Sequence, residues 1–295
     1  MRIAVADIGG TTIKVAIVNE EGVLTQYTEY DTESKKGGAY LVQKLITILK
    51  GFLPFEAIGI STAGQVDTKR GIITYANDNL PSYTGTKLQE LLEKAFQVPV
   101  KIENDVNAAA LGELHYGAGK EQTAFLCLTY GTGVGGAIIM DSKLYRGANG
   151  VAAEFGHIIV HPNGRNCNCG LKGCYEQYAS TTALIRQVQA VDSSYQNGRQ
   201  VFEALKQENK KIESVLSQWM DEIVLGLVSL IHCFNPSVII VGGGVMEQSQ
   251  VVEEITRRVR KQVIHSFSNV TIKQAVLGNR AGLLGAASLH IRHDG

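Results

Sequence analysis

Short apolar runs along the chain end repeatedly in polar or glycine-rich segments, a pattern typical of α/β proteins. Residues 3–18 form two β-rich runs joined by a Gly-Thr-rich turn at 7–12, which predicts a hairpin. Further strands are predicted at 58–60, 98–102, 125–129, 137–140 and 237–241. Helical patterns lie at 40–52, 88–95, 106–114, within 181–234, and at 251–263 and 281–290.

The order strand, Gly/Thr-rich turn, strand occurs twice, about 120 residues apart. It appears first at 3–18 and again at 125–140, where Tyr130 to Gly136 supplies the second turn. We interpret this as a weak internal repeat, and therefore as two related α/β lobes that face one another across a cleft. Two unrelated Gly-rich hairpins are the alternative interpretation.

The composition favours a folded protein that has no broad charged surface. Of the 295 residues, 44% are hydrophobic and 19% charged, which allows a sizeable core and argues against wholesale disorder. Lys plus Arg and Asp plus Glu number 28 each, so a nucleic-acid or anionic-membrane surface is not expected. The chain enters a strand at once and its apolar runs are interrupted before membrane-spanning length, so we expect no signal peptide and a soluble cytoplasmic protein.

Four glycine-rich elements follow predicted strands, at 7–12, 64, 130–136 and 242–244. Glycine lets backbone N–H groups approach phosphate oxygens, so the set favours nucleotide binding. None ends in Gly-Lys-Ser/Thr, and none is a G-x-G-x-x-G that leads into a helix, which disfavours P-loop enzymes and Rossmann dehydrogenases. Asp7 would hold Mg²⁺ through water, and Lys14 would offset phosphate charge. Alternatively, Asp7 only stabilises its own turn.

The triplet Glu103-Asn104-Asp105 ends one predicted strand and begins a predicted helix. Asn or Asp at such a point is commonly a helix N-cap. The functional alternative is a carboxylate aimed into the cleft, where it takes a proton from a substrate hydroxyl during phosphoryl transfer. The triplet alone does not decide between the two.

Three of the five cysteines lie within 167–174, and the chain has no predicted signal peptide. This pattern indicates a metal site rather than a disulfide framework. His157 with Cys167, Cys169 and Cys174 gives one N and three S ligands, a set typical of structural zinc, and His161 is the other candidate for the fourth ligand. Glu154 and Glu176 flank the cluster; both are either solvated surface residues or rigidly held acceptors for hydroxyl groups.

In chain order, these motifs resemble those of the ROK sugar kinases (repressors, open reading frames, kinases) of the actin-like ATPase superfamily. The resemblance covers nearly the whole chain. Its segments are the first phosphate loop, a Ser-x-Pro-Gly-x-Val-Asp segment, an Asn-Leu-Pro, the catalytic triplet, the second phosphate loop and the paired ROK signatures, at 7–14, 60–67, 79–81, 103–105, 129–136, 154–157 and 167–176. The last pair is highly specific.

The resemblance implies a two-lobed, actin-like (ribonuclease H-like) α/β fold with a cleft between the lobes. The N-terminal lobe would comprise 1–116 and a C-terminal helix at about 280–295, and the C-terminal lobe 117–279 with its zinc loop. It also implies Mg-ATP-dependent phosphorylation of the 6-hydroxyl of a hexose or N-acetylhexosamine, as by a glucokinase or an N-acetylmannosamine kinase. A homodimer is a further implication. The structural zinc ion is indicated by the cysteine cluster, and we expect no nucleic-acid or membrane partner because the charges are balanced.

The family's functional positions match residues of this chain one by one. Asp105 would be the general base. The implied sugar-binding residues are Gly64, Asn79, Asn104, Glu154, His157 and Glu176. The implied phosphate and Mg²⁺ residues are Asp7, Gly9, Gly10, Thr11, Thr12, Lys14, Thr132 and Gly133, with Gly243 and Gly244 on the adenosine side. The implied zinc ligands are Cys167, Cys169, Cys174 and the second ring nitrogen of His157.

The chain departs from the family pattern at two places. Ala63 replaces a frequent Pro, which would soften that loop. Ser82-Tyr83 replaces a frequent Gly-Trp near the sugar, so glucose specificity is not implied. Glucose, N-acetylmannosamine, N-acetylglucosamine and β-glucosides all suit the residues. A sugar-sensing regulator without kinase activity is the alternative function. ROK repressors carry a helix-turn-helix before the first phosphate loop; since that loop begins at Asp7 here, we expect a kinase.

Overall fold

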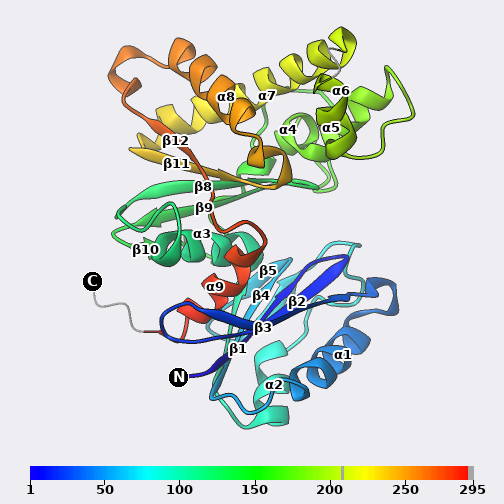
Figure 1. Cartoon of the computed structure of the whole chain (residues 1–295), viewed down its shortest axis with the longest axis vertical. Helices are drawn as coiled ribbons and strands as arrows, with labels where there is room; N and C mark the ends of the chain where they lie inside the picture. The colour runs from blue at the N-terminus through cyan, green and yellow to red at the C-terminus, as the bar shows by residue number, and fades with distance from the viewer. Residues whose placement is uncertain (207–208, 292–295) are drawn as a thin grey trace. The chain divides into compact units, whose positions relative to one another are not determined.

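The structure is a computed structural model that describes residues 1–206 and 209–291. The chain divides into two compact units. Unit 1 comprises Met1–Glu121, Ser142–Ala152 and the C-terminal segment from Asn279, and unit 2 comprises Gln122–Asp141 and Ala153–Gly278. Each unit contains α-helices and a five-stranded mixed sheet, as Figure 1 shows.

The sheet of unit 1 has the order β3-β2-β1-β4-β7. Its strands are β1 (Ile3–Ile8), β2 (Thr12–Val18), β3 (Leu24–Asp31), β4 (Ala57–Thr62) and β7 (Val100–Asn104). β1 pairs antiparallel with β2, which is the predicted hairpin, and parallel with β4, which pairs parallel with β7. A small antiparallel pair, β5 (Gln65–Asp67) and β6 (Ile72–Tyr75), follows β4.

Helices cover both faces of this sheet because alternate strand residues point in opposite directions. Ala4, Ala6 and Ile8 of β1 share a buried cluster with residues of α1 (Gly38–Lys50) and α2 (Leu88–Phe96). The other face receives α9 (Ala281–Ser288), which packs along α3 (Asp105–Tyr116). Gly285 allows this close approach, since a Cβ there would lie 1.7 Å from the Ala108 carbonyl oxygen.

The second five-stranded sheet repeats the same topology, with the order β10-β9-β8-β11-β12; its edge strand β10 lies in Ser142–Ala152, which is grouped with unit 1, and its other strands belong to unit 2. Its strands are β8 (Phe125–Tyr130), β9 (Val134–Met140), β10 (Lys143–Leu144), β11 (Val238–Gly242) and β12 (Thr271–Gln274). β8 pairs antiparallel with β9 and parallel with β11, and β11 pairs parallel with β12. The strand directions match those of unit 1, which agrees with the internal repeat and not with two unrelated hairpins.

The helices of unit 2 are α4 (Glu176–Ala179), α5 (Thr181–Gln189), α6 (Gly198–Lys206), α7 (Lys210–Phe234) and α8 (Ser249–Gln262). By length and composition alone, α7 is long and apolar enough to cross a membrane. Ten of its residues, among them Trp219 and Ile223, are buried, and many belong to the core of unit 2. Its hydrophobicity is therefore that of a core helix.

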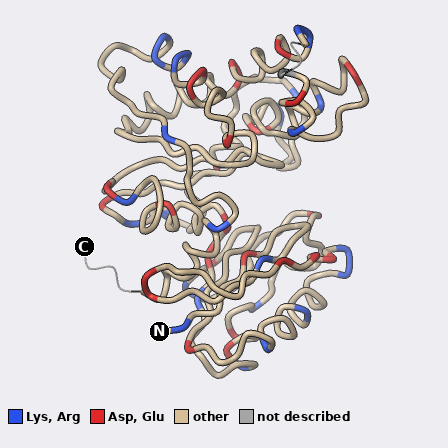
Figure 2. The backbone as a smooth tube through the Cα atoms, in the orientation of Figure 1, with Lys and Arg blue, Asp and Glu red and all other residues tan. Residues whose placement is uncertain are grey.

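Several predicted boundaries differ from the structure. The second Gly-rich turn is shorter than 130–136, because β9 begins at Val134. The C-terminal helix expected to about 295 ends at Ser288, and residues 292–295 lie outside the described part of the chain. Figure 2 shows basic and acidic residues interspersed along both units, in keeping with equal numbers of the two.

Candidate active site

Asp7 lies near the end of β1, directly before the first Gly-rich turn, and its carboxylate has two polar partners. The turn is closed by a hydrogen bond from the Gly9 N–H to the Thr12 carbonyl oxygen, 3.0 Å long. Asp7 Oδ1 accepts a 2.6 Å hydrogen bond from the Ser61 hydroxyl of β4, and its Oδ2 lies 3.6 Å from Lys14 Nζ. The carboxylate is therefore oriented by partners outside its own turn, in addition to any turn-stabilising role.

The predicted catalytic triplet lies where β7 ends and α3 begins. Asn104 is the N-cap: its Oδ1 accepts hydrogen bonds from the N–H groups of Val106 and Asn107, 3.0 and 3.1 Å long. Its Nδ2 donates to Gly64 O and to Asp105 Oδ1, both at 2.9 Å. Because Asn104 fills the capping role, the Asp105 carboxyl is not needed for it.

The surroundings of Asp105 favour its protonated form. Burial raises the pKa of its carboxyl to about 7, and the negative charge of Asp7 adds to this shift. Hydrogen bonds from the Val106 N–H and Asn104 act in the opposite direction but do not cancel it. A carboxylate with a pKa near neutrality is matched to accepting a proton at physiological pH.

Two other predicted residues of unit 1, Gly64 and Asn79, lie beside Asn104 and beside the first Gly-rich turn, respectively. Gly64 has φ +101°, and a Cβ there would lie 2.6 Å from the Tyr75 carbonyl oxygen, so the position requires glycine. Asn79 is exposed and lies beside the first Gly-rich turn, where a Cβ on Gly10 would be 3.5 Å from Asn79 Cβ. Unit 1 thus brings together Asp7, Gly10, Lys14, Gly64, Asn79, Asn104 and Asp105, in the two groups just described.

Unit 2 contains the predicted metal cluster. The candidate ligand atoms of His157, Cys167, Cys169 and Cys174 all lie within 4.8 Å of one another. Three thiols and an imidazole are a donor set that fits tetrahedral Zn²⁺. His161 is directed elsewhere: its Nε2 lies 2.7 Å from Glu222 Oε2, so the geometry favours His157 as the fourth ligand.

Glu176 connects this cluster to the second Gly-rich turn. Its Oε1 accepts a hydrogen bond from the Cys167 thiol, 3.2 Å long. Its Oε2 lies against Gly133, where an added Cβ would come within 2.5 Å of that oxygen. The cysteine cluster, the Glu176 carboxylate and the second turn, which also carries the exposed Thr132, therefore form one continuous group in unit 2.

The remaining predicted residues of unit 2 flank this group. Glu154 is exposed and directly precedes the short 3₁₀ helix Phe155–His157. Gly243 and Gly244 follow β11, and a Cβ on Gly243, which has φ +101°, would lie 2.2 Å from the Tyr130 carbonyl oxygen. The third Gly-rich element therefore adjoins the second turn.

Two polar residues of the site were not singled out from the sequence. Ser61 is paired with Asp7 by the parallel register of β1 and β4. Arg146 forms an ion pair with Glu103, with Arg146 Nη2 2.5 Å from Glu103 Oε2. The sequence signals for Ser61 are its place at the end of a strand and its match to the Ser of the Ser-x-Pro-Gly-x-Val-Asp segment. Arg146 has no signal because its partner lies 43 positions away (146 minus 103).

A comparison with protein-family models matches residues 3–293 to the ROK family. The chain belongs to the ROK family. Among curated ROK relatives, the glucokinase of Streptomyces coelicolor is 35% identical over 96% of this chain and 95% of its own length. The xylose repressor of Bacillus spizizenii is 31% identical over 80% of this chain and 61% of its own length.

Solved ROK structures share the fold of this chain. A ROK family glucokinase from Streptomyces griseus, in complex with glucose and AMPPNP, is 34% identical with a TM-score of 0.84, covering 98% of this chain and 99% of its own. The ROK hexokinase from Thermus thermophilus is 32% identical with a TM-score of 0.81, covering 97% of both chains. The actin-like α/β fold predicted from the sequence is thereby confirmed.

Proposed function

We propose that this chain is an ATP-dependent sugar kinase that phosphorylates the 6-hydroxyl of a hexose or N-acetylhexosamine, of the glucokinase or N-acetylmannosamine kinase type. The observation that carries the proposal is Asp105, whose carboxyl has a pKa of about 7 and is oriented by Asn104 at the start of α3. ROK glucokinase relatives, and a ROK glucokinase structure that holds glucose and an ATP analogue, support the choice of reaction and cosubstrate.

In the proposed reaction, Asp105 accepts the proton of the sugar hydroxyl while that oxygen forms a bond to the γ-phosphorus of ATP. The bond from the γ-phosphorus to the bridging oxygen breaks, and ADP leaves. Bound sugar is oriented by hydroxyl contacts, which hold the reacting atoms in line. The residues proposed for this are Gly64, Asn79, Asn104, Glu154, His157 and Glu176.

The phosphates are proposed to lie against the two Gly/Thr-rich turns. Backbone N–H groups and hydroxyls there offer donors to the phosphate oxygens, and the Lys14 ammonium offsets their charge. The proposed residues are Gly9, Gly10, Thr11, Thr12, Thr132 and Gly133, with Gly243 and Gly244 beside the adenosine. Asp7 fits a Mg²⁺ ion held through water, because its carboxylate is preoriented by Ser61; bound Mg²⁺ would neutralise phosphate charge.

A zinc ion held by His157, Cys167, Cys169 and Cys174 is proposed to be structural. Bound there, it would hold the cysteines as thiolates and fix the loop that lies beside Glu176. His157 Nδ1 lies 3.7 Å from Cys167 Sγ, so Nδ1 is the ring nitrogen proposed to bind zinc. The other ring nitrogen, Nε2, is therefore the one proposed to contact the sugar. We further propose a cytoplasmic homodimer without nucleic-acid or membrane partners, and mass measurement by light scattering tests the dimer.

A panel of sugars tests the function. Purified protein is mixed with Mg-ATP and, separately, with glucose, N-acetylmannosamine, N-acetylglucosamine and a β-glucoside, and ADP release is followed by a coupled assay. We expect ADP release that depends on one of these sugars. The xylose repressor relative favours a second candidate, a sugar-sensing regulator. Sugar binding without sugar-dependent ADP release would support this candidate and contradict the kinase.

A further inference from the structure

The ion pair between Glu103 and Arg146 lies one residue from the proposed sugar-binding and catalytic pair. Glu103 is only 1% exposed, and Arg146 is its charged partner through Oε2. The other oxygen, Oε1, accepts hydrogen bonds from the Asn104 N–H and from Asn107 Nδ2, 2.9 and 3.1 Å long. Each oxygen of the carboxylate thus has a partner, and the side chain is fixed between the start of α3 and Arg146.

Arg146 belongs to a segment with an unusual path. Ser142–Ala152 is grouped with unit 1, although the residues before and after it belong to unit 2. The Arg146 carbonyl oxygen accepts a hydrogen bond from the Ala152 N–H, 3.2 Å long, which closes this segment into a loop. Two residues after Ala152 comes Glu154, a proposed sugar ligand.

The remaining contacts of this loop that the structure gives with the rest of unit 1 are weak. A Cβ on Gly150 would lie 3.9 Å from the Val66 carbonyl oxygen, and Tyr145 and Val151 are both exposed. A fully buried carboxylate that is paired with a guanidinium is held much more strongly than a pair at the surface. The Glu103–Arg146 pair is therefore the strong contact that the structure gives between this loop and the rest of unit 1; the start of the loop, β10 (Lys143–Leu144), is also paired with β9.

We propose that Arg146 is a positioning residue for the sugar. Through Glu103 it anchors the loop that leads into Glu154 to the end of β7, which carries Asn104 and Asp105. The inference rests on the proposed function in that the positioned ligand is the sugar. Its observable consequence is selective: loss of the anchor weakens sugar binding, while nucleotide binding by the Gly-rich turns is left alone.

The test compares Arg146→Met, Arg146→Lys and the double variant Glu103→Gln/Arg146→Met with the parent. Arg146→Met leaves the buried Glu103 carboxylate without its charged partner, so it lowers both stability and sugar affinity. In the double variant the introduced side-chain amide keeps an oxygen for Asn104 and Asn107 but carries no charge. We therefore expect the melting temperature to recover while the KM for sugar stays raised by about tenfold, with the KM for ATP changed less than about twofold. Arg146→Lys restores most of the sugar affinity.

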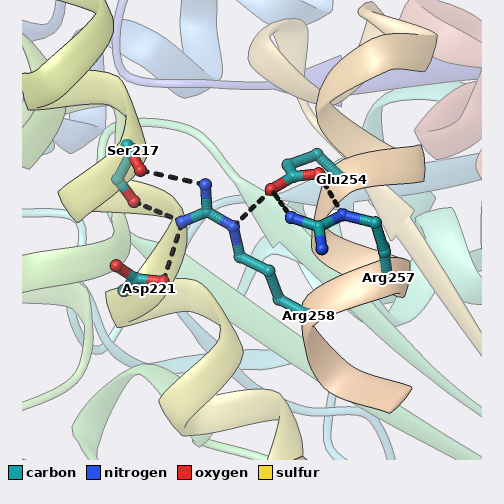
Figure 3. Close-up of polar contacts among 5 residues, drawn as sticks. All are labelled: Ser217, Asp221, Glu254, Arg257 and Arg258. Carbon is teal, nitrogen blue, oxygen red and sulfur yellow. Dashed lines mark hydrogen bonds and ion pairs between the residues drawn. The ribbon is translucent and has the colours of Figure 1, made fainter. Parts of the chain in front are cut away.

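Arg258→Met is the matched control, because it removes an ion pair that is far along the chain from every proposed site residue of unit 1. Figure 3 shows Arg258 of α8 bonded to Glu254, Asp221 and Ser217. Its side chain is 16% exposed, compared with 34% for Arg146. We expect Arg258→Met to lower the melting temperature without a selective change in the KM for sugar.

The proposal is overturned if the double variant recovers the sugar KM together with its stability, since the pair would then only neutralise a buried charge. Equal changes in the KM for sugar and ATP would also overturn it. Amide hydrogen exchange of 142–152 tests the anchor independently of activity: we expect faster exchange in Arg146→Met and unchanged exchange in Arg258→Met. If no sugar is phosphorylated by the parent, the proposed function fails, whereas the exchange result still decides whether the anchor exists.

Discussion

Replacing Asp105 with Asn should separate the chemistry of the site from the stability of the fold. Asn has the same shape as Asp, and its side-chain oxygen still accepts the hydrogen bonds from Asn104 Nδ2 and the Val106 N–H. It cannot accept the proton of a hydroxyl. We expect turnover to fall by about two to four orders of magnitude, the usual contribution of a general base, while sugar binding is largely retained.

The same substitution should stabilise the protein at alkaline pH. The pKa of Asp105 is raised from 3.8 to about 7 in the folded state, a shift of about three units, which corresponds to about 4 kcal/mol at about 1.4 kcal/mol per unit. Because the folded pKa is the higher one, the favourable contribution is complete below about pH 4 and is lost as the pH rises through about 7. Asn at this position stays neutral, so its contribution to the free energy of unfolding does not change with pH. Allowing for the partial exposure of the side chain, we expect the free energy of unfolding of Asp105→Asn to exceed that of the parent by about 2–4 kcal/mol at pH 8.

Urea unfolding of the parent and of Asp105→Asn at pH 5 and pH 8 measures this effect. The difference in unfolding free energy between the two proteins should increase in favour of Asn from pH 5 to pH 8. The rate profile provides a second check: kcat/KM for sugar should fall about tenfold per pH unit below about pH 7, as Asp105 becomes protonated. A pH-independent stability difference, or activity that persists undiminished to pH 5, would refute the reasoning.

The remaining predictions concern unit 2. Cys169→Ser should lose bound zinc and lower the melting temperature, whereas Cys233→Ser, outside the cluster, should retain the metal; equal zinc content by mass spectrometry in both would contradict the cluster. Gly133→Ala should displace the Glu176 carboxylate, which its Cβ would meet at 2.5 Å, and raise the KM for sugar. The control is Gly131→Ala, where an added Cβ meets nothing within 4 Å, and steady-state kinetics of the two should differ.

The sequence predicted strands and helices well where an apolar period is clear, and poorly elsewhere. The hairpin β1–β2 and the strands β4, β8 and β11 are nearly continuous apolar runs that are buried in a sheet, and their positions are confirmed. β3 was missed because all of its residues are at least partly exposed, so it has no alternating apolar face. It is an edge strand that is held by antiparallel pairing with the preceding strand β2.

The sequence also predicted some features of the candidate site, while others depend on the fold. The cysteine spacing predicted a metal cluster, but only the fold distinguishes His157 from His161, because Glu222 of α7 binds the latter. The triplet at 103–105 pointed to a cap or a base, and the structure assigns the cap to Asn104. The raised pKa of Asp105 could not be anticipated from the sequence, since it depends on burial and on Asp7, which lies on another strand.

A single-turnover experiment with γ-labelled ATP shows whether Asp105 is the base for phosphoryl transfer to a sugar. Parent protein and Asp105→Asn are each mixed with labelled ATP and the sugar that the panel identifies, and the labelled products are separated. We expect the parent to transfer the label to the 6-hydroxyl of the sugar, while Asp105→Asn binds the same sugar and transfers almost none. Label that passes only to water in the parent, or transfer to sugar at a near-parental rate in Asp105→Asn, would contradict this expectation.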